Sequence, residues 1–226
     1  AIIATSLPLF AKNMKKFERR YLSEPIELKA DDKTGEQKIV GYGAVFESRS
    51  ENLGGFTEVI EKGAFDEVLK NDVRALFNHD PNFVLGRSLA GTLRLSVDDV
   101  GLRYEIDAPQ TQTVRDLVLE PMARGDITGS SFGFSVEEDS WSENEDGAIT
   151  RSIQKIGRLV DVSPVTYPAY PETDVALRSL SEYQEDQVSG QHEEKHEDGC
   201  EECRSKDDRI ARLSASLEIY KRFTAA

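Results

Sequence analysis

Residues 92 to 107 alternate apolar and polar side chains in two short runs that flank a turn. The runs, Thr92 to Val97 and Leu102 to Asp107, are separated by Asp98-Asp99-Val100-Gly101. A repeat of two places successive side chains on opposite faces of a strand, and acidic residues followed by glycine favour a turn between strands. This stretch therefore predicts a β-hairpin, and it restricts the chain to folds that contain an antiparallel sheet.

Further strands are predicted along the chain by the same signals. Residues 25–30 and 37–47 flank a polar turn with a glycine and predict a second hairpin. Shorter apolar runs predict strands at 73–77, at 131–136 and in a strand pair that ends at 158–165. An acidic, glycine-containing excursion over 137–148 is expected to separate the last two.

Helical spacing of apolar residues is confined to a few segments. Residues 63–71 predict a short helix, and residues 111–124 predict a longer one that Pro121 is expected to kink or end. With strands in the majority, we predict an α+β fold that is predominantly β.

The pattern weakens after residue 180. Residues 181–208 hold eleven acidic and three basic side chains, a composition typical of a solvated, disordered linker. Residues 209–226 regain helical spacing and predict a short terminal helix. We therefore divide the chain into an N-terminal extension (1–23), a globular domain (24–180), a flexible acidic linker (181–208) and a C-terminal helix (209–226).

Charge and hydropathy exclude two classes of partner. The net charge of −14 disfavours nucleic acid, since a protein that follows a phosphate backbone needs a basic face. The sequence has no apolar run long enough to span a membrane. The two cysteines, Cys200 and Cys203, lie too close together to staple a fold, so a reducing compartment is expected.

The acidic tail contains four residues that could act as metal ligands. Two imidazoles and two thiolates in the order H-x3-H-x3-C-x2-C could bind tetrahedral zinc, and they belong to His192, His196, Cys200 and Cys203. The spacing between the two pairs is shorter than in zinc fingers, and almost no apolar residue is available to pack around a metal. We favour a metal-free tether and keep a zinc-dependent interaction module as an alternative.

One histidine stands in the first 191 residues, and it is His79. Imidazole is the side chain whose ordinary pKa, about 6.5, allows proton transfer near neutral pH. Ser130 and Ser131 follow later on a glycine-flanked bend, and a hydroxyl becomes a nucleophile when a base takes its proton. A histidine and a serine are two of the residues that a serine hydrolase requires, although either serine could instead satisfy backbone groups in a turn.

A base of this kind is oriented by a third group, often a carboxylate. Asp161 is the leading candidate because it lies between Val160 and Val162, where a carboxylate is unfavourable unless it is paired. Asp66 and Asp80 are rival partners for the histidine. A surface position on the strand remains the alternative interpretation of Asp161.

Five short blocks, taken in order, resemble the prohead proteases of tailed bacteriophages. The resemblance covers residues 25–178. Each block alone is weak evidence for the family, whereas the series of five in this order is specific to it. The blocks are Gly-Tyr-Gly-Ala-Val-Phe at 41–46, Glu-Lys-Gly-Ala-Phe-Asp at 61–66, Asn-His-Asp at 78–80, Gly-Ser-Ser-Phe-Gly-Phe at 129–134 and Leu-Val-Asp-Val-Ser-Pro-Val-Thr-Tyr-Pro-Ala at 159–169.

The resemblance implies a serine protease of capsid maturation, similar in fold to the herpesvirus assembly protease, with a β-barrel core and flanking helices. It assigns His79 as general base and Ser131, rather than Ser130, as nucleophile. It assigns Asp161 as the acid that orients the histidine, at a position where the family more often carries glutamate. No cofactor is implied.

Such a protease cuts the scaffolding part of the phage major capsid protein, and then itself, inside the immature capsid in the host cytoplasm. Self-association is a further contact that the resemblance allows, and the C-terminal tail is expected to be a targeting or pro-segment. The alternative from another class is a non-catalytic capsid-assembly or tail-tube-like structural protein that shares the barrel.

Overall fold

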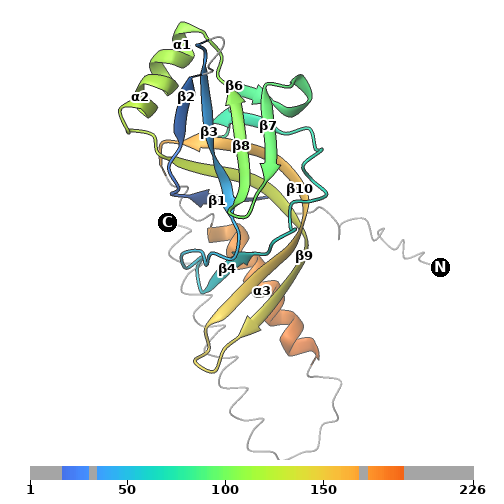
Figure 1. Cartoon of the computed structure of the whole chain (residues 1–226). Coiled ribbons are helices and arrows are strands. Elements are labelled where there is room, and N and C mark those ends of the chain that lie inside the picture. The colour runs from blue at the N-terminus through green and yellow to red at the C-terminus, as the bar shows by residue number, and fades with distance from the viewer. Residues whose placement is uncertain (1–16, 31–34, 168–172, 191–226) are drawn as a thin grey trace, which may run out of the picture. The chain divides into compact units, whose positions relative to one another are not determined.

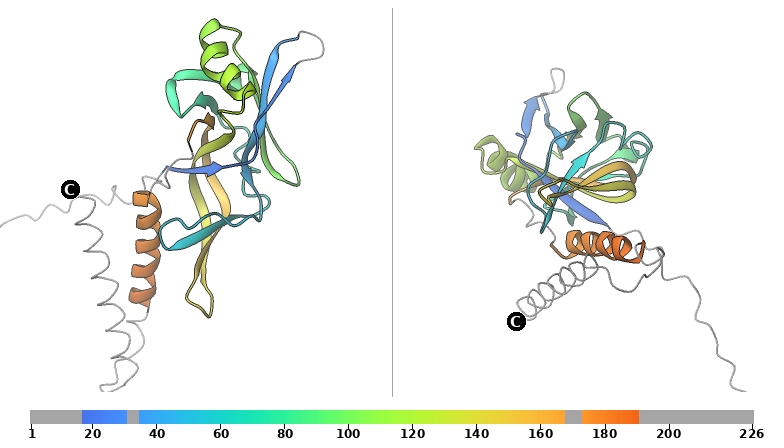
Figure 2. Two further views of the ribbon diagram at one scale, coloured as in Figure 1. Left: turned by 90° about the vertical axis from the view of Figure 1, so that its left-hand side faces the viewer. Right: turned by 90° about the horizontal axis from the view of Figure 1, so that it is seen from below.

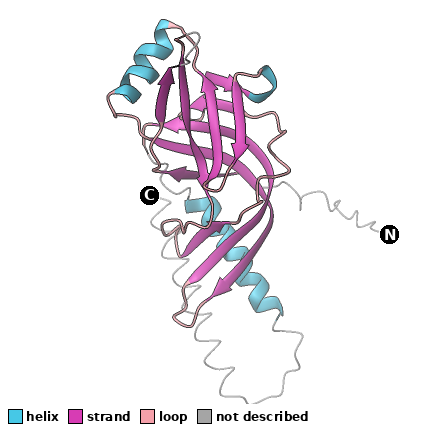
Figure 3. Ribbon diagram, in the orientation of Figure 1, coloured by secondary structure: helices cyan, strands magenta, loops and turns pink. Residues whose placement is uncertain are grey.

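The computed structural model describes residues 17–30, 35–167 and 173–190. Strands dominate these residues and helices are few, as the colouring by secondary structure shows (Figure 3). The predicted α+β, predominantly β class is therefore confirmed.

Most of the strands belong to one six-stranded sheet. Strands β1, β9, β10, β5 and β6 follow one another in this order, and β4 pairs with another stretch of β10. Strand β10 is the centre of the sheet, antiparallel to β9 and parallel to β4 and β5. The bounds are Glu18–Leu22 for β1, Phe56–Ile60 for β4, Arg74–Phe77 for β5, Asp80–Arg87 for β6, Gly129–Glu143 for β9 and Ile149–Val165 for β10.

The second sheet has four antiparallel strands in the order β2-β3-β8-β7. Both predicted hairpins lie in it, and both are confirmed: β2 pairs with β3, and β7 pairs with β8. The bounds are Glu27–Ala30 for β2, Gln37–Val45 for β3, Leu93–Val97 for β7 and Gly101–Asp107 for β8.

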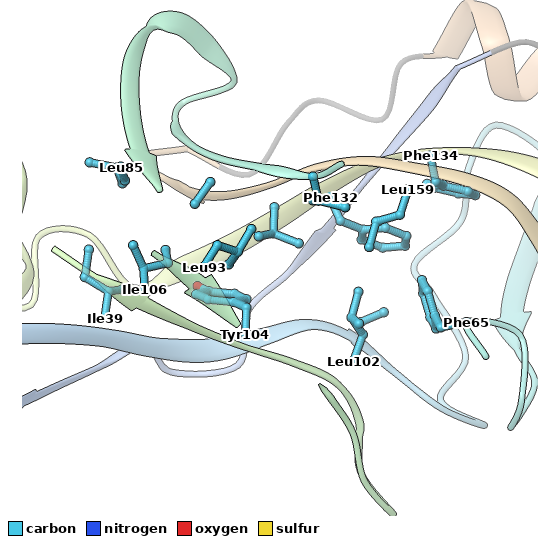
Figure 4. Close-up of a cluster of buried hydrophobic side chains, with 14 of the residues drawn as sticks. Ile39, Phe65, Leu85, Leu93, Leu102, Tyr104, Ile106, Phe132, Phe134 and Leu159 are labelled. Atoms are coloured by element: carbon cyan, nitrogen blue, oxygen red, sulfur yellow. The ribbon is translucent and has the colours of Figure 1, made fainter. Parts of the chain in front are cut away.

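The two sheets pack on each other and bury one apolar core between them (Figures 1 and 4). Leu102, Tyr104 and Ile106 of β8 face this core, as do Phe132 and Phe134 of β9, whose rings stack at 4.6 Å. Both sheets are open within the part of the chain described, and neither closes on itself. The expected herpesvirus-protease-like barrel core is therefore not confirmed.

The predicted helix at 63–71 is wrong. This stretch forms a series of turns in which the N–H groups of Ala64, Asp66, Val68 and Asn71 each donate to the carbonyl three residues earlier. The apolar residues that suggested a helix are nevertheless buried, among them Phe65 with no exposed surface. Consecutive turns place apolar residues on one side much as a helix does, so the spacing alone does not separate the two.

The predicted helix at 111–124 is confirmed as one helical segment with a wider turn in its middle. It consists of α1 (Gln112–Val114), a π turn (Arg115–Leu119) and α2 (Glu120–Ala123), and the Thr111 hydroxyl accepts the first free N–H, that of Val114. Pro121 lacks an N–H to donate, and the helix ends two residues after it.

The acidic excursion expected at 137–148 is mostly strand. Strands β9 and β10 continue through it as a long hairpin that projects beyond the four-stranded sheet (Figure 2), and Asn144 closes the turn at its tip. Side chains 137–140 are exposed, and an exposed acidic ribbon resembles a loop in sequence.

Helix α3 (Thr173–Gly190) packs on this hairpin through its first half. Leu180 joins a small apolar cluster with Phe56, and the rings of Trp141 and Tyr183 stack at 5.0 Å. The helix includes residues 181–190 of the segment predicted as a linker. The rest of the linker, the terminal helix and the candidate zinc ligands lie outside the described residues, so the proposed domain boundaries stay predictions.

Strand β1 is fixed to the sheet by a buried ionic cluster of five side chains. Arg151 of β10 binds Glu18 of β1 at 2.9 Å, Glu58 of β4 at 3.2 Å and Asp139 of β9 at 2.6 Å. Arg20 of β1 also binds Glu58, at 2.7 Å. Sequence reasoning predicted neither β1 nor β4, which are short and carry charged residues.

No helix in the described part of the chain is long and apolar enough to cross a membrane.

Candidate active site

The candidate histidine stands at the tip of the β5–β6 hairpin. Phe77 pairs with Asp80, so Asn78 and His79 form a two-residue turn, and both have positive φ, 53° and 57°. Turns of this length match the twist of the strands when both central residues adopt positive φ. Asparagine and histidine are both among the non-glycine residues that are enriched at positive φ. The turn projects the imidazole out of the hairpin toward β10.

Asn78 fixes this turn to the end of β10. Its backbone N–H donates to the Pro164 carbonyl at 3.0 Å, and its side-chain amide both donates to the Thr166 hydroxyl at 3.1 Å and accepts from the Thr166 N–H at 2.8 Å. Three hydrogen bonds from one residue hold the hairpin tip against the strand that carries Asp161.

The other candidates lie on adjacent strands and on one face of the sheet. On β9, Phe132 and Phe134 face the core, so the alternating Ser131 and Gly133 face the opposite side. Across the ladder, Ser131 pairs with Ser163 of β10, and Gly133 pairs with Asp161. Residues directly opposite each other point to the same face.

These elements bring the three predicted residues into one hydrogen-bonded row. His79 Nε2 lies 2.7 Å from Ser131 Oγ, and His79 Nδ1 lies 2.5 Å from Asp161 Oδ1. An ionised carboxylate can only accept, so the proton on Nδ1 donates to Asp161, and Nε2 is left to accept from the serine hydroxyl. The arrangement can transfer a proton from the hydroxyl to the imidazole.

The geometry also separates the rival candidates. Ser130 points to the other face, where its hydroxyl lies 2.7 Å from the hydroxyl of Tyr104 in the core. Burial raises the pKa of Tyr104, and the bond to Ser130 offsets only part of this effect. Asp80 accepts from the backbone and side chain of Asn82. Both ring nitrogens of His79 already have partners, which leaves neither for Asp66.

The row is buried. Ser131 has no exposed surface, and the side chains of His79 and Asp161 are 8% and 7% exposed. Tyr21 of the edge strand β1 pairs directly with Ser131, and its ring lies against Gly129, so that a Cβ on that glycine would come within 2.3 Å of the ring. Ser131 is therefore covered from solvent, and Tyr21 is its neighbour on the β1 side of the sheet.

Two residues at this site were not predicted. Ser163 Oγ donates to Asp161 Oδ1 at 2.9 Å and lies 3.2 Å from His79 Nδ1, and Gly133 lies directly beneath the Asp161 carboxylate. The available signal was spacing, since Ser163 follows Asp161 by two and so shares its face of the strand.

Among residues 17–30, 35–167 and 173–190, no group of three or more His, Cys, Asp or Glu side chains is arranged so that it could hold a metal ion.

Comparison with known proteins identifies a family. The sequence model of the caudovirus prohead serine proteases matches residues 24–186. Among solved structures, the capsid assembly protease of bacteriophage T4 is similar, with 13% sequence identity, a TM-score of 0.42, and coverage of 69% of this chain and 100% of that one. The comparison with curated proteins gives no match.

The family match covers every described strand except β1, including the histidine turn and the strand that carries Ser131, and it agrees with the resemblance carried by the five sequence blocks. This chain belongs to the caudovirus prohead serine protease family.

Proposed function

We propose that the chain is an endopeptidase in which Ser131 is the nucleophile, His79 the general base and Asp161 the group that orients the histidine. The observation that supports this most strongly is the pair of short contacts on the two nitrogens of one ring, 2.7 Å to Ser131 and 2.5 Å to Asp161. A nucleophile, a base and an orienting acid in such a row are the requirements for acyl transfer by serine.

In this mechanism Ser131 Oγ attacks the carbonyl carbon of the scissile peptide while His79 Nε2 takes the hydroxyl proton. The resulting imidazolium is stabilised by Asp161 through Nδ1–H and then gives the proton to the leaving amine. The acyl-enzyme is hydrolysed by water, which His79 deprotonates in the same way. Asp161 holds the ring in the tautomer that leaves Nε2 free to accept.

The proposed substrates are the scaffolding portion of the phage major capsid protein and the chain itself, cut inside the immature capsid in the host cytoplasm. Family membership supports this assignment. The alternative, a non-catalytic capsid-assembly or tail-tube-like protein, has no comparable support, because the family is one of proteases and the hydrogen-bonded row is complete.

The test is to express the full chain, with and without the capsid protein, beside Ser131→Ala and His79→Ala. Cleavage should be lost in both variants while circular dichroism shows that each still folds. Ser130→Ala is the matched control, since this serine is the neighbour on the opposite face and should leave cleavage intact. Cleavage that persists in both the Ser131→Ala and the His79→Ala variants would refute the mechanism.

A further inference from the structure

We propose that Ser163 is a positioning residue that acts through Asp161 on His79, with Gly133 as the surface against which the Asp161 carboxylate rests. This inference rests on the proposed function, because it concerns the orienting half of the same hydrogen-bonded row. Ser163 does not contact the attacking atom. It lies across the ladder from Ser131, on the neighbouring strand.

The contacts of Ser163 are directed at the Asp161–His79 pair. Its Oγ lies 2.9 Å from Asp161 Oδ1 and 3.2 Å from His79 Nδ1. The side chain is fully buried, so water does not compete for the hydroxyl. The protonated Nδ1 donates and cannot accept, and therefore the Ser163 proton is directed at the carboxylate.

Asp161 Oδ1 thus accepts two hydrogen bonds, one from the ring and one from Ser163. Two donors on one oxygen fix the torsion of the carboxylate more closely than one donor does. Asp161 is only 5% exposed, so solvent offers little replacement for a lost donor. Hydrogen bonds to a charged group are also stronger than those between neutral groups.

Gly133 provides the space that the second oxygen occupies. A Cβ at this position would lie 2.7 Å from Asp161 Oδ2, a distance that real Cβ atoms do not tolerate. The bare backbone of β9 therefore leaves room for the carboxylate, and Asp161 and Gly133 are direct partners across the ladder. Ser163 on one oxygen and Gly133 under the other hold the carboxylate in a single orientation toward Nδ1.

The first measurement is steady-state cleavage by the full chain of a peptide that carries its own self-cleavage sequence, mapped by mass spectrometry. Ser163→Ala should lower kcat by about 10- to 100-fold, the value of one hydrogen bond to a charged group. KM should stay within about twofold, because Ser163 touches no substrate. Ser163→Thr keeps the hydroxyl and should retain most of kcat. Ser135→Ala, a buried serine of β9 outside the site, should change neither constant.

The second measurement does not depend on activity. In the Ser131→Ala background, the proton on His79 Nδ1 should give a far-downfield NMR resonance because its bond to Asp161 is short. Ser163→Ala and Gly133→Ala should each shift or broaden this resonance, whereas Ser163→Thr and Ser135→Ala should preserve it. A role confined to folding would leave the resonance unchanged in every variant that folds.

The outcomes separate the two proposals. An unchanged resonance in Ser163→Ala overturns the positioning role, whether or not kcat falls. A shifted resonance with reduced kcat and rescue by threonine supports it. If the parent chain shows no cleavage that depends on Ser131, the proposed function fails, and the resonance alone then decides whether Ser163 orients the ring.

Discussion

Removing Arg151 from the buried ionic cluster should destabilise the protein severely. The guanidinium is 5% exposed and contacts Glu18, Glu58 and Asp139, of which Glu18 and Glu58 are 3% and 2% exposed. Arg151→Met would leave Arg20 as the one base beside two buried carboxylates. Breaking a buried pair by removing one partner costs about 3–5 kcal/mol, because the remaining charge is uncompensated. At about 2–4 °C per kcal/mol for a domain of this size, the melting temperature should fall by roughly 6–20 °C.

The assay is urea and thermal unfolding followed by circular dichroism, with Ser131→Ala present in every variant to prevent self-cleavage. Arg94→Met is the matched control. Arg94 also bonds two carboxylates, those of Glu105 and Asp107, but its side chain is 45% exposed. An exposed ion pair contributes about 0–1 kcal/mol, so this variant should unfold near the parent temperature.

Arg151→Lys keeps the charge but loses the forked geometry and should fall between the other two variants. If Arg151→Met and Arg94→Met lose the same stability, then burial does not amplify these contacts, and the role assigned to the cluster is wrong.

Three further predictions concern β1 and the histidine turn. Burial raises the pKa of Glu18, but the charges of Arg20 and Arg151 outweigh burial, so the pKa is lowered overall. Glu18 therefore contributes stability above its ordinary pKa of about 4.3, and this contribution is lost as the pH falls through the lowered value. Glu18→Gln should flatten the acid limb of a stability–pH curve. Asn78→Gly keeps positive φ but loses the side-chain hydrogen bonds to the residues at the end of β10, so it should lower kcat. Asn78→Ala loses the same bonds and also forces positive φ on a residue with a Cβ, so in urea unfolding it should be about 1 kcal/mol less stable than Asn78→Gly. Tyr21→Ala should speed the labelling of Ser131 by a small sulfonyl fluoride, measured by mass spectrometry, whereas Tyr21→Phe should not.

The parts of the fold that the sequence predicted are those with local signals. Alternation and turn residues identified both hairpins of the four-stranded sheet, because each strand there pairs with a neighbour across a short turn or hairpin. The outer part of the β9–β10 hairpin was missed because residues 137–140 are acidic and exposed, so that only pairing with β10 makes them a strand. Strand preference depends on such partners more than on the residues themselves.

The candidate site also contains residues that could be predicted from the sequence and residues that could not. His79, Ser131 and Asp161 could be selected because each is chemically unusual where it stands. Ser163 and Gly133 could not, because a serine and a glycine in strands are ordinary until the ladder pairs them with Ser131 and Asp161. Register is a property of two strands distant in sequence, and neither strand encodes it alone.

The burial of Ser131 relates the ionic cluster to the candidate active site. Ser131 has two neighbours in the sheet: Ser163 on the central strand β10, and Tyr21 on the edge strand β1. β10 is paired on both sides, whereas the ladder joins β1 to β9 alone. Access to Ser131 by movement within the sheet therefore breaks the fewest hydrogen bonds if β1 moves, and the Glu18 and Arg20 contacts oppose that movement.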